Sequence, residues 1–113
     1  MHLEGEGERL TVFVDENDRY HHRPLYAEIV QRARKAGLAG ATVLRGIEGF
    51  GATTVLHESH ALHLSDALPV VIVIVDRTER IEAFLPVLDE LIGEGLVVRE
   101  PVEVLTYRAG GQR

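Results

Sequence analysis

The sequence contains no cysteine and no tryptophan. Without cysteine the chain cannot form disulfide bonds, thiolate metal sites or a cysteine nucleophile. With no tryptophan and only 3 Phe and 3 Tyr, a stacking platform for single-stranded nucleic acid is not expected. Basic residues are also few, because 12 Lys and Arg face 18 Asp and Glu, for a formal net charge of −6 at pH 7. Nucleic-acid binding needs a basic face that displaces counterions from phosphate, so we expect no nucleic-acid partner.

Long hydrophobic runs are missing as well. The longest unbroken apolar run is Val70–Val75, far short of the roughly 20 residues that a membrane-spanning helix needs. The first residues, Met1–Glu8, are acidic and rich in glycine, unlike a secretion signal. We therefore expect a cytoplasmic protein that is not embedded in a membrane. Its 113 residues predict a single domain, 1–113, with a core at about 8–107.

The hydrophobic pattern predicts two strand–helix–strand units in succession. β-branched apolar runs predict strands, and apolar residues at helical spacing predict helices. The expected strands are Leu10–Val14, Ala41–Ile47, Val70–Val75 and Leu96–Leu105, the last interrupted near Glu100–Pro101; the expected helices are Pro24–Ala36, with Pro24 as first helical residue, and Asp76–Ile92, bent at Pro86. Two such units predict an α+β fold, the ferredoxin-like βαββαβ sandwich, with a four-stranded antiparallel sheet and two helices on one face.

The sheet face without helices is expected to be unusually apolar. Val70–Val75 reads VVIVIV, without the alternation typical of a strand that has one wet face. Exposing three large side chains of one strand forfeits several kcal/mol at about 25 cal/mol per Å². We therefore expect another subunit to cover this face, so that the protein is a homo-oligomer. The alternative cover is the long connection Gly49–Leu68 of the same chain.

Two glycine-bearing segments are candidates for ligand binding. Arg45–Gly51 reads RGIEGFG, and its glycines let backbone N–H groups form an anion-binding nest to which an arginine adds a phosphate contact. Gly93–Gly95 follows the second helix, and Arg99 lies further along the last strand. The candidate ligand-binding residues are Arg45, Gly46, Gly49, Gly51, Gly93, Gly95 and Arg99. The alternatives are a β-bulge with a turn for the first segment and a helix cap with a turn for the second.

Histidines in the long connection offer a different hypothesis. His57, His60 and His63 recur every third residue, and on a helix they could hold a Zn²⁺ ion with help from Glu58 or Asp66. The alternative function is therefore a divalent-metal-binding or metal-tolerance trimer, and the alternative structure is a solvated histidine-rich loop. No set of nucleophile, base and acid is apparent, so we expect no enzyme.

Several motifs resemble a known family. They are Pro24-Leu25-Tyr26, GATVLRGIEGFG at Gly40–Gly51, LPVVI at Leu68–Ile72, Phe84-Leu85-Pro86 and EGLV at Glu94–Val97. With these motifs the chain, from about Glu8 to Tyr107, resembles the bacterial and archaeal domain-of-unknown-function-190 family, a PII-like group.

This resemblance implies a homotrimer with the fold of PII signalling proteins, which bind adenine nucleotides (ATP, ADP or AMP) in clefts between subunits. It implies that Arg45–Gly51 and Gly93–Gly95 form such clefts. It also implies that a mobile loop at Gly51–Leu68 contacts a transporter or an enzyme as a regulatory target. Two family features are missing: Leu96 and Val97 follow Gly95 where PII proteins carry a lysine, and no tyrosine lies between Gly51 and Leu68.

Overall fold

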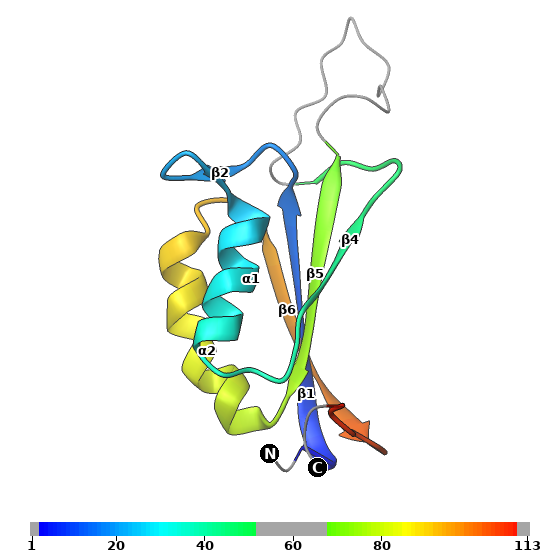
Figure 1. Ribbon diagram of the computed structural model, residues 1–113. Helices are drawn as coiled ribbons and strands as arrows, with labels where there is room; N and C mark the ends of the chain where they lie inside the picture. The colour runs from blue at the N-terminus through cyan, green and yellow to red at the C-terminus, as the bar shows by residue number, and fades with distance from the viewer. Residues whose placement is uncertain (1–2, 52–67, 111–113) are drawn as a thin grey trace, which may run out of the picture.

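A four-stranded antiparallel sheet carries two helices on one face (Figure 1). The computed structural model describes residues 3–51 and 68–110. The sheet strands are β1 (Gly5–Asp15), β4 (Thr42–Arg45), β5 (Pro69–Asp76) and β6 (Leu96–Val104), the helices are α1 (Leu25–Lys35) and α2 (Thr78–Leu91), and β2 (Arg19–Tyr20) pairs with β3 (Arg23–Pro24) in a short hairpin. The strand order is β4-β5-β1-β6, so the predicted ferredoxin-like arrangement is confirmed.

Some element boundaries differ from the prediction. β1 begins at Gly5 rather than Leu10, and α1 begins after Pro24, which caps the helix instead of being its first residue. β6 runs without a break through Pro101. It can do so because it is the last strand of the sheet, where the missing N–H of a proline need not remove a ladder hydrogen bond.

The core lies between the sheet and the helix layer. Along β5 buried and half-buried residues alternate, although the sequence there is apolar throughout. The buried side chains come from β1 (Leu10, Val12, Val14), β5 (Val70, Ile72, Ile74), α1 (Leu25, Ile29, Ala33) and α2 (Ile81, Phe84, Leu88, Leu91). Every second residue of β5 therefore points to the face that carries no helix.

Buried aspartates end the two strands that precede the hairpin and α2. Asp15 Oδ1 accepts a hydrogen bond of 2.7 Å from the N–H of Asn17. Asp76 is fully buried, and its two carboxylate oxygens accept hydrogen bonds from the N–H groups of Arg77 (2.7 Å) and Ala39 (2.8 Å). Both carboxylates accept hydrogen bonds from backbone N–H groups in turns. Leaving these N–H groups buried without an acceptor would lower the stability of the fold.

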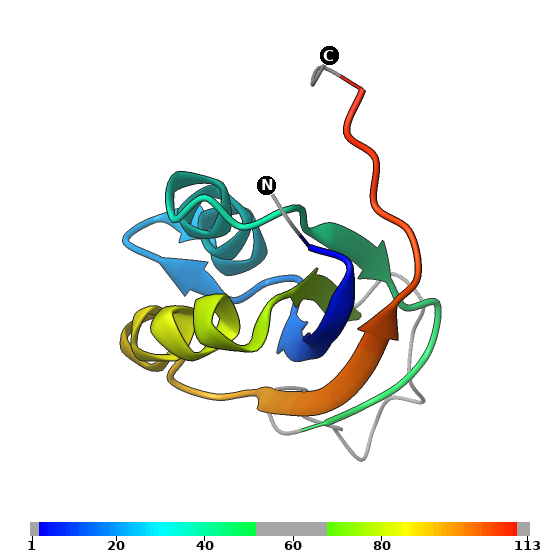
Figure 2. The same ribbon diagram turned by 90° about the horizontal axis from the view of Figure 1, so that it is seen from below.

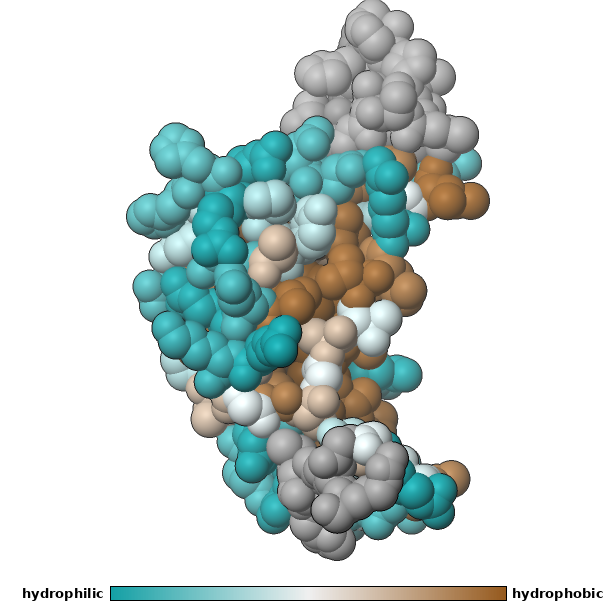
Figure 3. All heavy atoms as spheres, in the orientation of Figure 1, coloured by the Kyte–Doolittle hydropathy of each residue, from teal (hydrophilic) through white to brown (hydrophobic). Residues whose placement is uncertain are grey.

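The helix-free sheet face, called the open face below, is apolar at one end. Strand register places Leu44, Val71, Phe13 and Leu96 in one row across all four strands. The side chains of Leu44 and Leu96 are each 54% exposed. Figure 3 shows hydrophobic residues gathered along the β4 and β5 side of the molecule, whereas the helix layer is mainly hydrophilic. The expected apolar face is present in the described part of the chain, and what covers it stays a prediction.

Further along, the open face carries a charged pair beside Val75. There Arg9 of β1 forms a 2.9 Å ion pair with Glu100 of β6. Figure 2, seen from below, shows the chain leaving β6 and passing on toward its C-terminus close to β4.

Neither helix in residues 3–51 and 68–110 is long and apolar enough to cross a membrane.

Candidate functional site

Both glycine-bearing segments lie at the same end of the sheet but at opposite edges. β4 ends at Arg45, which pairs with Val70 at the start of β5. β6 begins at Leu96, directly after Gly95, and pairs with the end of β1. Two strands, β5 and β1, separate the two edges, so the strand ends at Arg45 and Leu96 are about 14 Å apart across the sheet at about 4.8 Å per strand.

The first segment closely contacts the start of β5. The N–H of Gly46 donates a 2.8 Å hydrogen bond to the carbonyl of Pro69. A Cβ atom on Gly46 would lie 2.9 Å from the Pro69 ring, and one on Gly49 would lie 3.2 Å from it. A Cβ on Gly51 would meet no atom within 4 Å among the described residues. Gly46 thus has a packing reason of its own, which Gly51 lacks among the described residues.

Arg45, the predicted phosphate contact, is held by a carboxylate. Its Nη2 donates to both oxygens of Glu16, at 3.2 and 2.9 Å. The same Glu16 carboxylate also accepts from the N–H of Leu68 at 3.3 Å. The Arg45 side chain is 65% exposed, so it can leave this pair for a stronger anion. Sequence reasoning missed Glu16, because its role depends on a contact 29 residues away along the chain.

The second segment is shaped by β1. Gly95 has φ +151°, and a Cβ atom there would lie 2.8 Å from the carbonyl oxygen of Phe13. At Gly93 an added Cβ would meet no described atom within 4 Å. The two glycines therefore differ in kind: Gly95 is required by packing, and Gly93 is open.

Acidic groups surround this second segment. Burial raises the pKa of the Asp18 carboxyl above its usual value, and the charges of Asp15 and Glu94 add to the rise. A hydrogen bond of 3.0 Å from the N–H of Asp15 to Asp18 Oδ2 opposes it. The carboxylate of Glu94 therefore lies close enough to Asp18, just after β1, for the two charges to repel.

Asp18→Asn is expected to stabilise the protein at neutral pH by about 0.5 kcal/mol, a size typical of substitutions at partly exposed sites. A raised folded-state pKa means that Asp18 contributes most to stability below its unfolded pKa and that this contribution is lost as pH rises through the folded pKa. Asparagine keeps an acceptor for the Asp15 N–H and carries no charge. Urea unfolding at acidic and neutral pH measures the effect, and an unchanged pH dependence in the variant would contradict it.

Arg99 lies away from both glycine segments. It pairs with Leu10, three residues along β6 from Leu96, which is about 10 Å of strand. Its guanidinium donates to both oxygens of Glu8 (2.9 and 3.0 Å) and to Glu82 of α2 (2.8 Å). These hydrogen bonds raise the pKa of Arg99. In one chain Arg99 joins β1, β6 and α2, and a ligand-binding role for it stays a prediction.

The histidines of the metal hypothesis, His57, His60 and His63, lie outside the described residues, as do Glu58 and Asp66. Among the residues that the structure describes, no three His, Asp or Glu side chains are grouped so that they could hold a metal ion.

Comparison with known proteins identifies relatives of nearly the whole chain. A model of the DUF190 family, described as "Uncharacterized ACR, COG1993", matches residues 7–104. A UPF0166 protein of Aquifex aeolicus (strain VF5) is 38% identical over 98 residues, which cover 85% of this chain and 90% of the relative.

Solved structures that are similar to this chain include CPII from Thiomonas intermedia K12. One, bound to ADP and bicarbonate, has a TM-score of 0.51 and 20% identity and covers 88% of each chain. Another, described as a nitrogen regulatory PII-like protein bound to ADP, AMP and bicarbonate, has a TM-score of 0.46 and 17% identity, with 88% of this chain and 94% of CPII covered. The likeness to the first structure shows that the fold is PII-like.

Proposed function

Since this chain belongs to the DUF190 family and has a PII-like fold, we propose that it is a PII-like regulatory protein. It binds an adenine nucleotide in clefts between copies of the chain and acts by binding, without catalysing a reaction. The closest support in the comparisons is that CPII, which shares the fold, is bound to ADP and bicarbonate.

The placement of the two glycine segments carries this proposal. The strand ends that carry them lie at the same end of the sheet, one at the β4 edge and one at the β6 edge, so each of these edges can face a neighbouring copy. In a ring of identical copies, a head-to-tail contact places one surface of a copy against a different surface of the next. A contact of this kind between the β4 edge and the β6 edge would bring Arg45–Gly51 of one copy to Gly93–Gly95 of its neighbour.

Such a ring also explains the open face. Three copies, the number that the family resemblance implies, can turn their open faces toward the central axis. The row of Leu44, Val71, Phe13 and Leu96 would then be removed from water, which favours assembly by about 25 cal/mol for each Å² of apolar area buried.

The chemistry of the cleft suits a nucleotide phosphate, with Arg45 as its main cation. Backbone N–H groups beside Gly49 and Gly51 are suited to phosphate oxygens. In the bound state Arg45 contacts the phosphate instead of Glu16. Binding of the phosphate must therefore compensate for the two hydrogen bonds that Arg45 loses to Glu16. Glu94 opposes the phosphate charge, which predicts weaker binding than an edge with a lysine would give.

ADP is expected to bind the native assembly, and Arg45→Ala is expected to weaken this binding about tenfold or more, since hydrogen bonds to charged groups contribute roughly 1.5–3 kcal/mol. Glu94→Gln is expected to strengthen it several-fold by removing a like charge. Isothermal titration with ADP, ATP and AMP, with and without bicarbonate, measures the affinities. Arg19→Ala, which removes an exposed arginine of β2, is the matched control.

The proposal fails if none of the three nucleotides binds the native protein, or if Arg45→Ala and Arg19→Ala bind ADP equally well. A transporter or an enzyme is the class of target that the proposed regulator would control. The segment proposed to contact that target, Gly51–Leu68, falls almost wholly outside the described residues.

A further inference from the structure

A basic groove lies on the outer surface of α1, on the opposite side of the sheet from the open face. Its volume is about 490 Å³. The residues that line it are Arg23, Glu28, Gln31, Arg32, Arg34 and Lys35. Four of these six residues are cations and one is a carboxylate, so the groove carries a charge of 4 − 1 = +3 in a chain whose net charge is −6. This local excess favours an anion with two or three charges.

Buried in the groove wall is a carboxylate, Glu28, one oxygen of which has an ion-pair partner but no hydrogen-bond donor among the described residues. The Glu28 side chain is only 10% exposed, and its Oε2 accepts a 2.9 Å hydrogen bond from Arg32 Nε. This bond raises the pKa of Arg32. Glu28 Oε1 is 3.3 Å from Arg23 Nη1, yet it accepts no hydrogen bond from any residue that the structure describes. The Arg23 ion pair offsets part of the cost of burying this oxygen, and a ligand hydroxyl that points at it would add the aligned hydrogen bond that Arg23 does not make.

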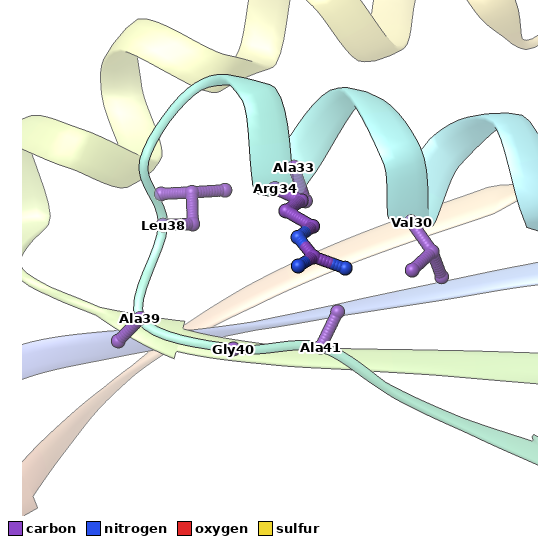
Figure 4. Close-up of a pocket in the computed structure, with 7 residues that line it drawn as sticks. All are labelled: Val30, Ala33, Arg34, Leu38, Ala39, Gly40 and Ala41. Atoms are coloured by element: carbon purple, nitrogen blue, oxygen red, sulfur yellow. The ribbon is translucent and has the colours of Figure 1, made fainter. Parts of the chain in front are cut away.

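Two of the four surrounding cations, Arg34 and Lys35, are available to such a ligand, whereas Arg23 also donates a hydrogen bond to Gln31 Oε1 and Arg32 donates one to Glu28. No ion pair joins Arg34 or Lys35 to another residue within 3–51 or 68–110. Figure 4 shows the Arg34 side chain extending between α1 and the segment 38–41, in a neighbouring hollow of about 290 Å³. Arg34 thus borders both hollows. The Arg23 side chain is 55% exposed and can turn away from Glu28 Oε1.

From this geometry we infer that the α1 groove binds a hydroxylated organic anion, of the class of polyol and sugar phosphates. Its phosphate contacts Lys35 and the neighbouring arginines, and one of its hydroxyl groups donates a hydrogen bond to Glu28 Oε1. An amine would fit less well, because an ammonium group is repelled by a groove of charge +3. This site is separate from the proposed nucleotide cleft and goes beyond that function.

Two probes that differ in their hydroxyl groups test the inference. Glycerol 3-phosphate is expected to bind the native protein about tenfold more tightly than propyl phosphate, as one hydrogen bond to a charged group predicts. Calorimetric titration of each probe, with inorganic phosphate as a third ligand, measures the preference. Equal affinity for all three would show simple attraction of anions and overturn the proposal, and so would the absence of glycerol 3-phosphate binding at millimolar concentration.

Two variants separate the hydroxyl contact from the charge. In Glu28→Gln the amide oxygen must face Arg32, which leaves the NH₂ group toward the ligand, so the preference for glycerol 3-phosphate is expected to disappear while propyl phosphate binds at least as well. Lys35→Ala is expected to weaken both probes several-fold and keep the preference. A preference that survives in Glu28→Gln protein of native melting temperature would overturn the assignment. Both variants leave Arg45 unchanged and are expected to bind ADP as the native protein does, so failure of this inference is distinguishable from failure of the nucleotide cleft.

Discussion

Phe13→Lys is expected to convert the proposed oligomer into single chains. Phe13 lies in the middle of the apolar row of the open face, paired with Val71 on one side and Leu96 on the other. In a single chain this side chain is 37% exposed, so a lysine can lie along the sheet with its ammonium group in water. In an interface between open faces the same ammonium would be buried without a partner, which costs several kcal/mol for each copy.

Light scattering coupled to size-exclusion chromatography at micromolar concentration measures this effect. The control is Ala83→Lys, which adds the same charge at an exposed position of α2 on the helix side of the sheet. The native protein and the control are expected to have the same oligomeric mass, and Phe13→Lys is expected to have the mass of one chain. A native protein that is already a single chain would remove the basis of both the assembly and the clefts.

Gly95→Ala is expected to destabilise the fold by about 2–3 kcal/mol, whereas Gly93→Ala has little effect on stability. At Gly95 the new Cβ would lie 2.8 Å from the Phe13 carbonyl and 3.3 Å from Val14 Cγ1, in a backbone conformation of φ +151° that side chains disfavour. β6 would have to move away from β1 at the point where its pairing begins. For a domain of this size the loss lowers the melting temperature by about 10 °C or more.

The pair of variants also separates structure from binding in the second glycine segment. Thermal unfolding measures stability, and ADP titration on the same samples measures binding. Gly93→Ala is expected to keep native stability, so a loss of ADP binding in that variant would assign a ligand role to the open glycine. Equal melting temperatures for Gly95→Ala and Gly93→Ala would contradict the packing argument.

Structural features that depend on residues close together in the chain were predictable from the sequence. The apolar run of β5 predicted both a strand and an apolar face on the side of the sheet without helices. Side chains alternate between the two faces along any strand, and no position of that run is polar. The hairpin of β2 and β3 was missed: its turn at His21 and His22 has positive φ at both residues, a conformation that histidine seldom adopts.

The types of residue in the candidate site were predictable from the sequence, but the residues that they contact were not. The motif RGIEGFG indicated a glycine-rich strand end with an arginine, because these residues are adjacent in the sequence. The pairing of Arg45 with Glu16, and of Arg99 with Glu8 and Glu82, joins residues that are 17 to 91 positions apart. Charged residues at such separations carry no periodic signal, so only the folded arrangement identifies which of them meet.

The amino-acid order alone therefore settled the fold class, because hydrophobic periodicity is a local property that each strand and helix carries within itself. Tertiary structure decided the rest. It placed the two glycine segments at one end of the sheet but on opposite edges, and it buried one oxygen of Glu28 beside four cations. Both results come from packing elements together, which brings distant residues into contact and removes particular polar atoms from water.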